Sequence, residues 1–245
     1  MRLRHSVKLL LAAVICSTSL AAGDDIAPAT AAAIRATLHE RYPELHIAGI
    51  HKSPLPGLYE LETGSELVYI NEDASMIVAG RIIEAKTRTD LTAARWDAIN
   101  AVDFNTLPFD LALKSVRGDG SRKVVIFADP MCPYCRMLEQ EMQGINNVTI
   151  YTFLFPLEQI HPGANEKALH IWCAKNPTDA WSKWMLKQTD PGTATCTTAP
   201  IDKLQALGQK LRIDSTPTLF TPDGKRTRGA LKHNDIEQLL ASTHK

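Results

Sequence analysis

Two cysteines separated by two residues follow closely on an apolar run in this 245-residue chain. The run KVVIFA covers residues 123–128, and Cys132 and Cys135 come next, ahead of a leucine-bearing stretch with helical spacing. A fully apolar run is typical of a strand that is covered on both faces. The cysteine pair is therefore predicted at a junction between a strand and a helix, which limits the chemistry it can perform.

Four kinds of site use this cysteine spacing: a haem attachment site, half of a zinc site, a structural disulfide and a working redox pair. Haem attachment requires His directly after the second cysteine, and Arg136 stands there. A structural zinc site needs a second close pair of ligands, whereas Cys173 and Cys196 are far apart. A disulfide across two residues closes a very small loop and stabilises little. The spacing thus favours a redox pair, without metal or cofactor.

The residues between the cysteines indicate how such a pair would work. Pro133 suits the first turn of a helix, because its missing N–H would be unpaired there anyway. Cys132 then lies at the helix N-terminus, where free N–H groups and the helix dipole stabilise a thiolate. We expect Cys132 to be the nucleophile and Cys135, one turn on, to be the resolving thiol. Tyr134 adds a hydroxyl and a flat surface.

A proline opens a second apolar stretch, STPTLF, at residues 215–220. Pro217 cannot donate to a strand ladder. In the cis form it would expose the backbone of Thr216 beside Cys132, where an extended substrate could pair with it. Since cis bonds are uncommon, an ordinary trans proline in a loop is the alternative.

The first residues have the pattern of a secretory signal peptide. Three basic residues precede a short apolar run that ends in small residues. We expect residues 1–23 to be cleaved off, with Cys16 among them; a buried N-terminal helix is the alternative. The 27 basic and 27 acidic residues then become a balance near −3, which argues against nucleic acid as a partner. The remaining cysteines, an even number, permit disulfides in an exported protein.

The rest of the chain predicts three parts. Residues 29–43 have a helical pattern, and residues 46–84 alternate as in an antiparallel sheet of about four strands. Residues 87–107 return to a helical period and are predicted to form a linker helix. From residue 109 onward strands and helices alternate, which implies a parallel crossover.

Three segments, FADPMCPYC, IWCAKN and STPTLF, resemble in their order and spacing the thioredoxin-fold domain of the bacterial periplasmic DsbC/DsbG disulfide isomerases. The signal peptide, the N-terminal helix and sheet, and the linker helix resemble that family's architecture. The resemblance implies an α+β chain with a cystatin-like dimerisation domain at 24–86, a linker helix at 87–107 and a thioredoxin-like α/β domain at 108–245.

The resemblance also implies a function. Members of the family are periplasmic homodimers that isomerise or reduce incorrect disulfides in misoxidised exported proteins, with chaperone activity. A membrane reductase of the DsbD type keeps their active pair reduced. By resemblance, Cys132 and Cys135 are the catalytic pair, and Thr216 and Pro217 form the cis-proline loop that binds substrate.

Two details point to different branches of the family. The dipeptide Pro133–Tyr134 is similar to that of DsbG, whereas Cys173 and Cys196 look like the structural disulfide of DsbC. The alternatives are therefore a DsbG-like reductase of oxidised single cysteines, or a holdase that binds unfolded chains.

Several other residues receive plainer interpretations. Asp129, three residues before Cys132, either influences proton transfer or is a solvated residue at a strand end. Arg136 either holds a thiolate or is a solvated helix residue. Six histidines have no ligand spacing and are interpreted as surface or packing residues: His39, His46, His51, His161, His170 and His233. Three tryptophans at helical intervals are predicted to be core: Trp172, Trp181 and Trp184.

Overall fold

The computed structural model describes residues 26–64 and 66–242, and these divide into two compact units after Gly80. Each unit has its own cluster of buried apolar side chains. The predicted signal peptide at 1–23 lies outside the described residues. In the part of the chain that is described, no helix is long and apolar enough to span a membrane.

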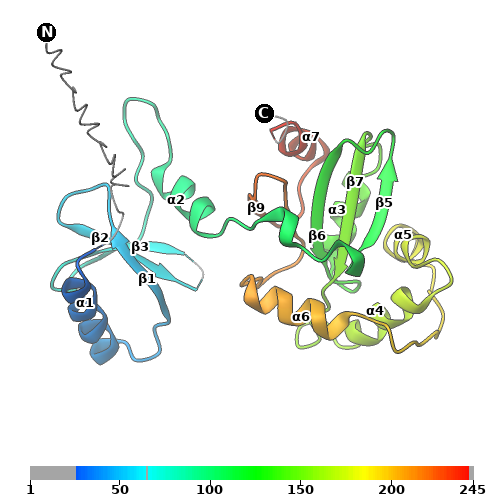
Figure 1. Cartoon of the computed structure of the whole chain (residues 1–245), viewed down its shortest axis with the longest axis horizontal. Coiled ribbons are helices and arrows are strands. Elements are labelled where there is room, and N and C mark those ends of the chain that lie inside the picture. The colour runs from blue at the N-terminus through cyan, green and yellow to red at the C-terminus, as the bar shows by residue number, and fades with distance from the viewer. Residues whose placement is uncertain (1–25, 65, 243–245) are drawn as a thin grey trace, which may run out of the picture. The chain divides into compact units, whose positions relative to one another are not determined.

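The N-terminal unit is one helix packed on one antiparallel sheet (Figure 1). The elements are α1 (Pro28–Arg41), β1 (Ile47–Lys52), β2 (Leu58–Thr63), β3 (Leu67–Asn71) and β4 (Ile77–Val78). The strands pair in chain order, each antiparallel to the next. Ile34 and Leu38 of α1 are buried in one cluster with Leu61 and Ile70 of the sheet. The core thus forms where the apolar face of a short helix covers alternating strand residues.

The helix expected at 87–107 is shorter than predicted. The segment contains α2 (Leu91–Ile99) and a single 3₁₀ turn, η1 (Phe104–Thr106), and a second turn, η2 (Phe109–Leu111), follows it. The Asp90 carboxylate accepts from the Ala93 N–H at 2.9 Å and begins α2. The Asp103 carboxylate caps η1 in the same way, accepting from the Asn105 N–H. The helical period predicted one helix, but side chains that accept from backbone N–H groups begin two separate short elements in this segment.

The second unit is built on a five-stranded mixed sheet, in the order β5-β7-β6-β8-β9. Its strands are β5 (Leu113–Arg117), β6 (Arg122–Ala128), β7 (Val148–Leu154), β8 (Thr218–Phe220) and β9 (Arg226–Arg228). The predicted parallel crossover joins β6 to β7 through α3 (Pro133–Glu141). Because β6 lies between β7 and β8, its residues from Val124 to Ala128 are all buried. This central position explains the unbroken apolar run in the sequence.

Helices pack around this sheet, as Figure 1 shows for α3 beside the central strands. The others are α4 (Ala164–Cys173), α5 (Pro177–Lys187), α6 (Ile201–Lys210) and α7 (His233–Ala241). Helix α3 contacts α5, α6 contacts β7, and α7 contacts β6. At the core, Phe127 makes edge-on ring contacts with Phe153, Phe155 and Phe220.

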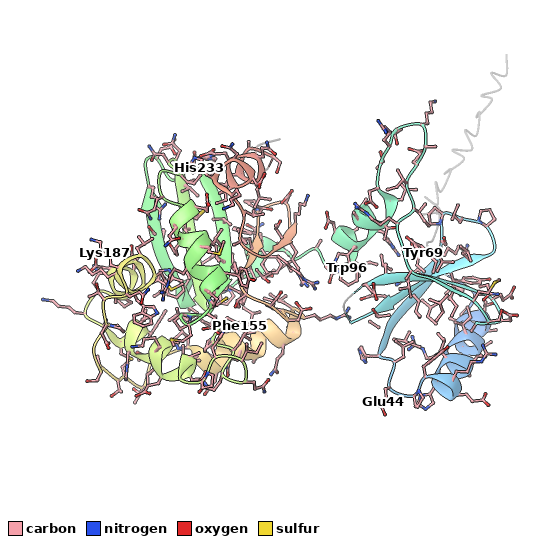
Figure 2. All side chains as sticks on the ribbon, turned by 180° about the vertical axis from the view of Figure 1, so that it is seen from behind. Glu44, Tyr69, Trp96, Phe155, Lys187 and His233 are labelled. Atoms are coloured by element: carbon pink, nitrogen blue, oxygen red, sulfur yellow. A yellow bond between two sulfur atoms is a disulfide. The ribbon has the colours of Figure 1, made fainter. Side chains whose placement is uncertain are left out.

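Three loops meet at the end of this sheet where β6 and β7 finish and β8 begins. Ala128 at the end of β6 pairs with Leu154 at the end of β7, and the next N–H, of Phe155, donates to the Ala128 carbonyl at 2.9 Å. Thr218 at the start of β8 pairs with Phe127. The segment after β6, the segment after β7 and the segment before β8 therefore lie together. In Figure 2 the labelled Phe155 lies at this end and His233 at the opposite end of the domain.

Candidate active site

The segment after β6 turns directly into α3 and places Cys132 at the helix N-terminus. Cys132 is the N-cap residue and Pro133 the first residue of the helix. The Cys132 carbonyl accepts the first helical hydrogen bond from the Arg136 N–H at 3.2 Å, while the Cys132 N–H donates to the Asp129 carbonyl. The side chain at the cap is a sulfur, so the free N–H groups of the first turn face a thiol instead of a capping oxygen.

The surroundings of Cys132 favour its thiolate. Hydrogen bonding from the Cys135 side chain is the largest contribution, and with the Thr216 side chain and the N–H groups of Cys135 and Tyr134 it outweighs desolvation. Together they lower the pKa of Cys132 from 9.0 to about 5. The Cys132 thiol also reaches the Thr216 carbonyl at 3.4 Å. Cys132 is 5% exposed, so only a small part of this residue reaches solvent.

Cys135 has the opposite surroundings. It is 1% exposed, and burial raises its pKa well above 9.0, followed by hydrogen bonding to Cys132 and the charge on that sulfur. Only the Asp129 N–H, at 3.4 Å from the Cys135 sulfur, and the Thr216 side chain act in the other direction. Both cysteines are free thiols. One thiol of the pair is thus favoured as a thiolate at neutral pH, and the other is held as a thiol.

The segment before β8 supplies the facing side of the site. The Thr216–Pro217 peptide bond is cis, and the Pro217 carbonyl accepts from the Gly229 N–H at 2.8 Å. The buried Thr216 hydroxyl has no conventional hydrogen-bond partner among the described residues, and it lowers the pKa of both cysteines. Thr216 and Pro217 therefore lie where the sequence predicted them, beside Cys132.

Three large side chains close to Cys132 in the sequence are exposed. Met131 is 37% exposed, Tyr134 59% and Met137 42%. Beneath the loop, the Trp184 indole N–H donates to the Pro130 carbonyl at 2.7 Å. Arg136 of α3 lies over the Trp184 ring of α5 and is half-buried, so it is not a fully solvated helix residue. Of the three tryptophans predicted to be core, Trp181 is buried, and Trp172 and Trp184 are half-buried.

The sequence did not reveal the role of Asp129. Its side chain is 0% exposed and lies 2.7 Å from the His161 imidazole, so the solvated alternative is wrong. His161, interpreted from the sequence as a surface or packing residue, makes this contact with a side chain that is 22% exposed. The one sequence signal was an acidic residue placed directly after a buried strand. In the described residues, no group of three or more His, Cys, Asp or Glu side chains is placed to hold a metal ion.

The second cysteine pair belongs to other elements of the fold. Cys173 ends α4 and Cys196 lies in an exposed loop. Their sulfurs are joined in a disulfide, with 5.6 Å between the Cα atoms. The cysteines among the described residues therefore form one bonded pair and one free pair.

Comparison with known proteins agrees with this geometry. Residues 109–244 match the thioredoxin-like domain family, and residues 25–93 match the N-terminal domain of disulfide bond isomerases. A probable thiol:disulfide interchange protein DsbC of Bordetella pertussis is 37% identical over 208 residues, which cover 85% of this chain and 73% of the relative. This chain belongs to the DsbC family. Its chemistry is thiol–disulfide exchange, and its fold is the predicted α+β arrangement that ends in a thioredoxin-like domain.

Two further comparisons extend along the chain. The thiol:disulfide interchange protein DsbC of Escherichia coli is 25% identical over 226 residues, covering 91% of this chain and 92% of the relative. A crystal structure of a disulfide interchange protein from Neisseria gonorrhoeae is similar at a TM-score of 0.55 and 35% identity. It covers 57% of this chain and 99% of the solved chain.

Proposed function

We propose that this member of the DsbC family rearranges and reduces incorrect disulfides in exported proteins, with Cys132 as nucleophile and Cys135 as resolving thiol. The observation that supports these roles is the asymmetry of the two thiols. The pKa of Cys132 is lowered to about 5, whereas burial raises the pKa of Cys135. A thiolate is the species that attacks a disulfide, so at neutral pH Cys132 attacks first.

The reaction proceeds through a mixed disulfide. The Cys132 thiolate attacks one sulfur of a substrate disulfide, bonds to it, and releases the other substrate sulfur as a thiolate. In isomerisation, a substrate thiolate attacks the substrate sulfur of the mixed disulfide and frees Cys132 again, with no net change in oxidation. In reduction, the Cys135 thiolate attacks the Cys132 sulfur and releases the substrate as a thiol, which leaves a Cys132–Cys135 disulfide.

Reduction consumes the reduced pair, so a dithiol must restore it. We assign this to a membrane reductase of the DsbD type, which transfers two electrons to the Cys132–Cys135 disulfide. The proposed setting is the periplasm, after removal of residues 1–23. The proposed domain boundaries are 24–86 for the dimerisation domain, 87–107 for the linker and 108–245 for the catalytic domain. The match at 109–244 supports the catalytic domain, and the match at 25–93 covers the dimerisation domain and runs into the linker.

Substrate contacts are proposed at the cis-proline loop and the apolar surface around Cys132. The Thr216 backbone would pair with an extended substrate. The exposed side chains of Met131, Tyr134 and Met137 would contact apolar residues that a misfolded chain leaves uncovered. The same surface supports the proposed chaperone activity.

A homodimer formed through the N-terminal domain is supported by the edge of its sheet. Strand β4 is the outermost strand of that sheet, and Met76, Ile77 and Val78 are 62%, 45% and 50% exposed. An uncovered apolar edge strand can pair with the same edge of a second copy. The double variant Ile77→Lys, Val78→Lys should therefore sediment as a monomer, and Leu55→Lys, at another exposed apolar residue of this domain, should stay dimeric. A double variant that remains a dimer would exclude this edge as the interface.

Refolding of a scrambled multi-disulfide protein tests the function. The mature protein in a glutathione buffer should restore the substrate's activity, and Cys132→Ser should not. Cys196→Ala together with Cys173→Ala should still catalyse refolding, since neither residue takes part in the proposed exchange steps. Equal refolding with and without wild-type protein would refute the isomerase.

The dipeptide Pro133–Tyr134, which is similar to that of DsbG, favours a second candidate, the reduction of oxidised single cysteines. A protein substrate with one sulfenic acid separates the two. Cys132 would attack the sulfenic sulfur with loss of water, and Cys135 would then resolve the mixed disulfide. Faster turnover of this substrate than of the scrambled protein would favour the reductase.

A further inference from the structure

The carboxylate of Asp129 is buried at the centre of the redox loop and is bound by three donors. Its Oδ1 accepts from the Met131 N–H at 2.7 Å. Its Oδ2 accepts from the Leu157 N–H at 2.8 Å and lies 2.7 Å from Nδ1 of His161. These donors come from both loops that follow β6 and β7. A single side chain therefore ties the two loops together.

The chemistry of these partners fixes the direction of each hydrogen bond. With Asp129 as a carboxylate, which only accepts, the contact is a hydrogen bond when His161 carries a proton on Nδ1 and donates it to Asp129. The His161 backbone is also held, because its N–H donates to the Leu157 carbonyl at 2.8 Å and its carbonyl accepts from the Ala164 N–H at 3.0 Å. His161, with its side chain 22% exposed, therefore closes the buried site on its outer side.

The backbone of Asp129 contacts both cysteines. The Asp129 N–H points to the Cys135 sulfur at 3.4 Å, and the Asp129 carbonyl accepts from the Cys132 N–H at 3.2 Å. A rotation of this backbone would alter both contacts at once. The side-chain bonds described above oppose such a rotation. Asp129 thus connects the packing of two loops to the positions of both sulfurs.

We propose that Asp129 is a positioning residue for the resolving step, and that His161 holds its carboxylate in place. The N–H of Asp129 is aimed at the Cys135 sulfur, where negative charge forms when that thiol ionises to attack Cys132. A preorganised donor at this place stabilises the attacking thiolate. The proposal rests on the roles of Cys132 and Cys135 given above. It adds Asp129, which acts through its backbone N–H and not by direct contact of its side chain with the reacting sulfurs.

The resolving step can be isolated by charging Cys132 with glutathione. Cys135 then attacks the Cys132 sulfur, the Cys132–glutathione bond breaks, and glutathione leaves as a thiol while the Cys132–Cys135 disulfide forms. The rate of glutathione release is the readout, with the unfolding midpoint measured on each variant. No external oxidant or reductant enters this step.

Four variants separate positioning from mere packing. His161→Ala removes the donor and should slow release about tenfold, the effect expected of one lost bond to a charged group. His161→Asn places an amide N–H close to the position of Nδ1 and should restore the rate to within about twofold. His161→Gln places its amide one carbon further out and should not restore it. Asp129→Asn must present an NH₂ group to one of its three donors, and should slow release by about tenfold or more.

Glu237→Gln is the matched control at the other end of β6. Glu237 pairs with Arg122, the first residue of that strand, so this variant removes an ion pair from the same strand without touching the redox loop. It should lower the unfolding midpoint and leave glutathione release unchanged. If the His161 variants and Asp129→Asn behave like Glu237→Gln, the side chains are structural only and the proposal is overturned. If wild-type protein itself does not release glutathione, the proposed role of Cys135 fails instead.

Discussion

The two cysteine pairs of this chain lie in contrasting surroundings. Cys132 and Cys135 are buried free thiols, with two residues between them, at the N-terminus of α3. Cys173 and Cys196 are a disulfide with a sequence separation of 23, and Cys196 lies in an exposed loop. The first pair has hydrogen-bond donors on its sulfurs, and the second crosslinks a helix end to a loop. The surroundings of the cysteines therefore differ between the pair of free thiols and the disulfide.

The difference teaches where reactivity originates. Thiolate stability at Cys132 comes from neighbours within a few residues and from Thr216 across the site. Those donors stabilise the reduced form, which makes the disulfide of this pair easier to reduce. In contrast, a crosslink between distant residues restricts the unfolded chain, so it stabilises the fold. One pair is therefore suited to exchange and the other to permanence.

The largest expected effect separates the two thiols within the first pair. Cys135→Ser should still form a mixed disulfide at Cys132 but should lose the step that releases reduced substrate. Turnover in reduction of a protein disulfide should fall by about a thousandfold, as expected when a reacting sulfur is removed. The turnover is measured as the rate of substrate reduction, and mass spectrometry detects the trapped mixed disulfide. Rapid turnover by this variant would show that Cys135 is not the resolving thiol.

A second effect concerns pH. Alkylation of Cys132 in the reduced folded protein should be half-maximal near pH 5, because its pKa is lowered to about 5, and at the ordinary value near 9.0 in the unfolded protein. The thiolate's contribution to stability is then complete above the unfolded pKa and is lost as pH falls through about 5. Unfolding free energy, compared with Cys132→Ser, should therefore rise between these pH values. A folded-state midpoint above pH 8 would contradict this account.

Removal of the second pair should affect stability and leave exchange intact. Cys173→Ala with Cys196→Ala opens a loop whose closure contributes about 3 kcal/mol in the chain-entropy model. Denaturant unfolding should show a loss of this size, and the rate of catalysed refolding per folded molecule should stay within about twofold. A double variant as inactive as Cys132→Ser would remove the distinction between the pairs.

The smallest expected effect tests whether a buried carboxyl group of α3 influences the thiols of the active pair. Glu139 is buried, its pKa is raised by burial, and it accepts from the Trp181 indole N–H at 2.6 Å. In Glu139→Gln the amide oxygen can keep that bond, so unfolding free energy should change by about 1 kcal/mol or less. The difference should favour the variant as pH rises above 4.5, because the wild type must then bury a charge. The alkylation profile of Cys132 should not move; a shift would mean that Glu139 contributes to the site.

The first pair was predictable because its signals are local. An apolar strand, a proline at the first helical position and two cysteines one turn apart lie within residues 123–135. The division of 87–107 into shorter elements was not predictable from periodicity, since Asp90 begins α2 and Asp103 begins η1. The pairing of Cys173 with Cys196 came only from family resemblance, because spacing does not fix connectivity.

The contact between Asp129 and His161 was beyond sequence reasoning. These residues are 32 positions apart and meet only because β6 and β7 are parallel neighbours whose ends coincide. Nothing in the residues near His161 indicates that pairing. A contact made by tertiary structure between two loops leaves no local pattern.

Redox titration with the state of each cysteine measured by mass spectrometry tests the central claim most directly. Mature protein is equilibrated in glutathione buffers of graded potential, the thiols are blocked, and the peptides containing each cysteine are quantified. We predict that Cys132 and Cys135 pass between dithiol and disulfide over a range in which Cys173 and Cys196 stay fully bonded. Reduction of Cys173–Cys196 at the same or a less reducing potential would contradict the division of work between the two pairs.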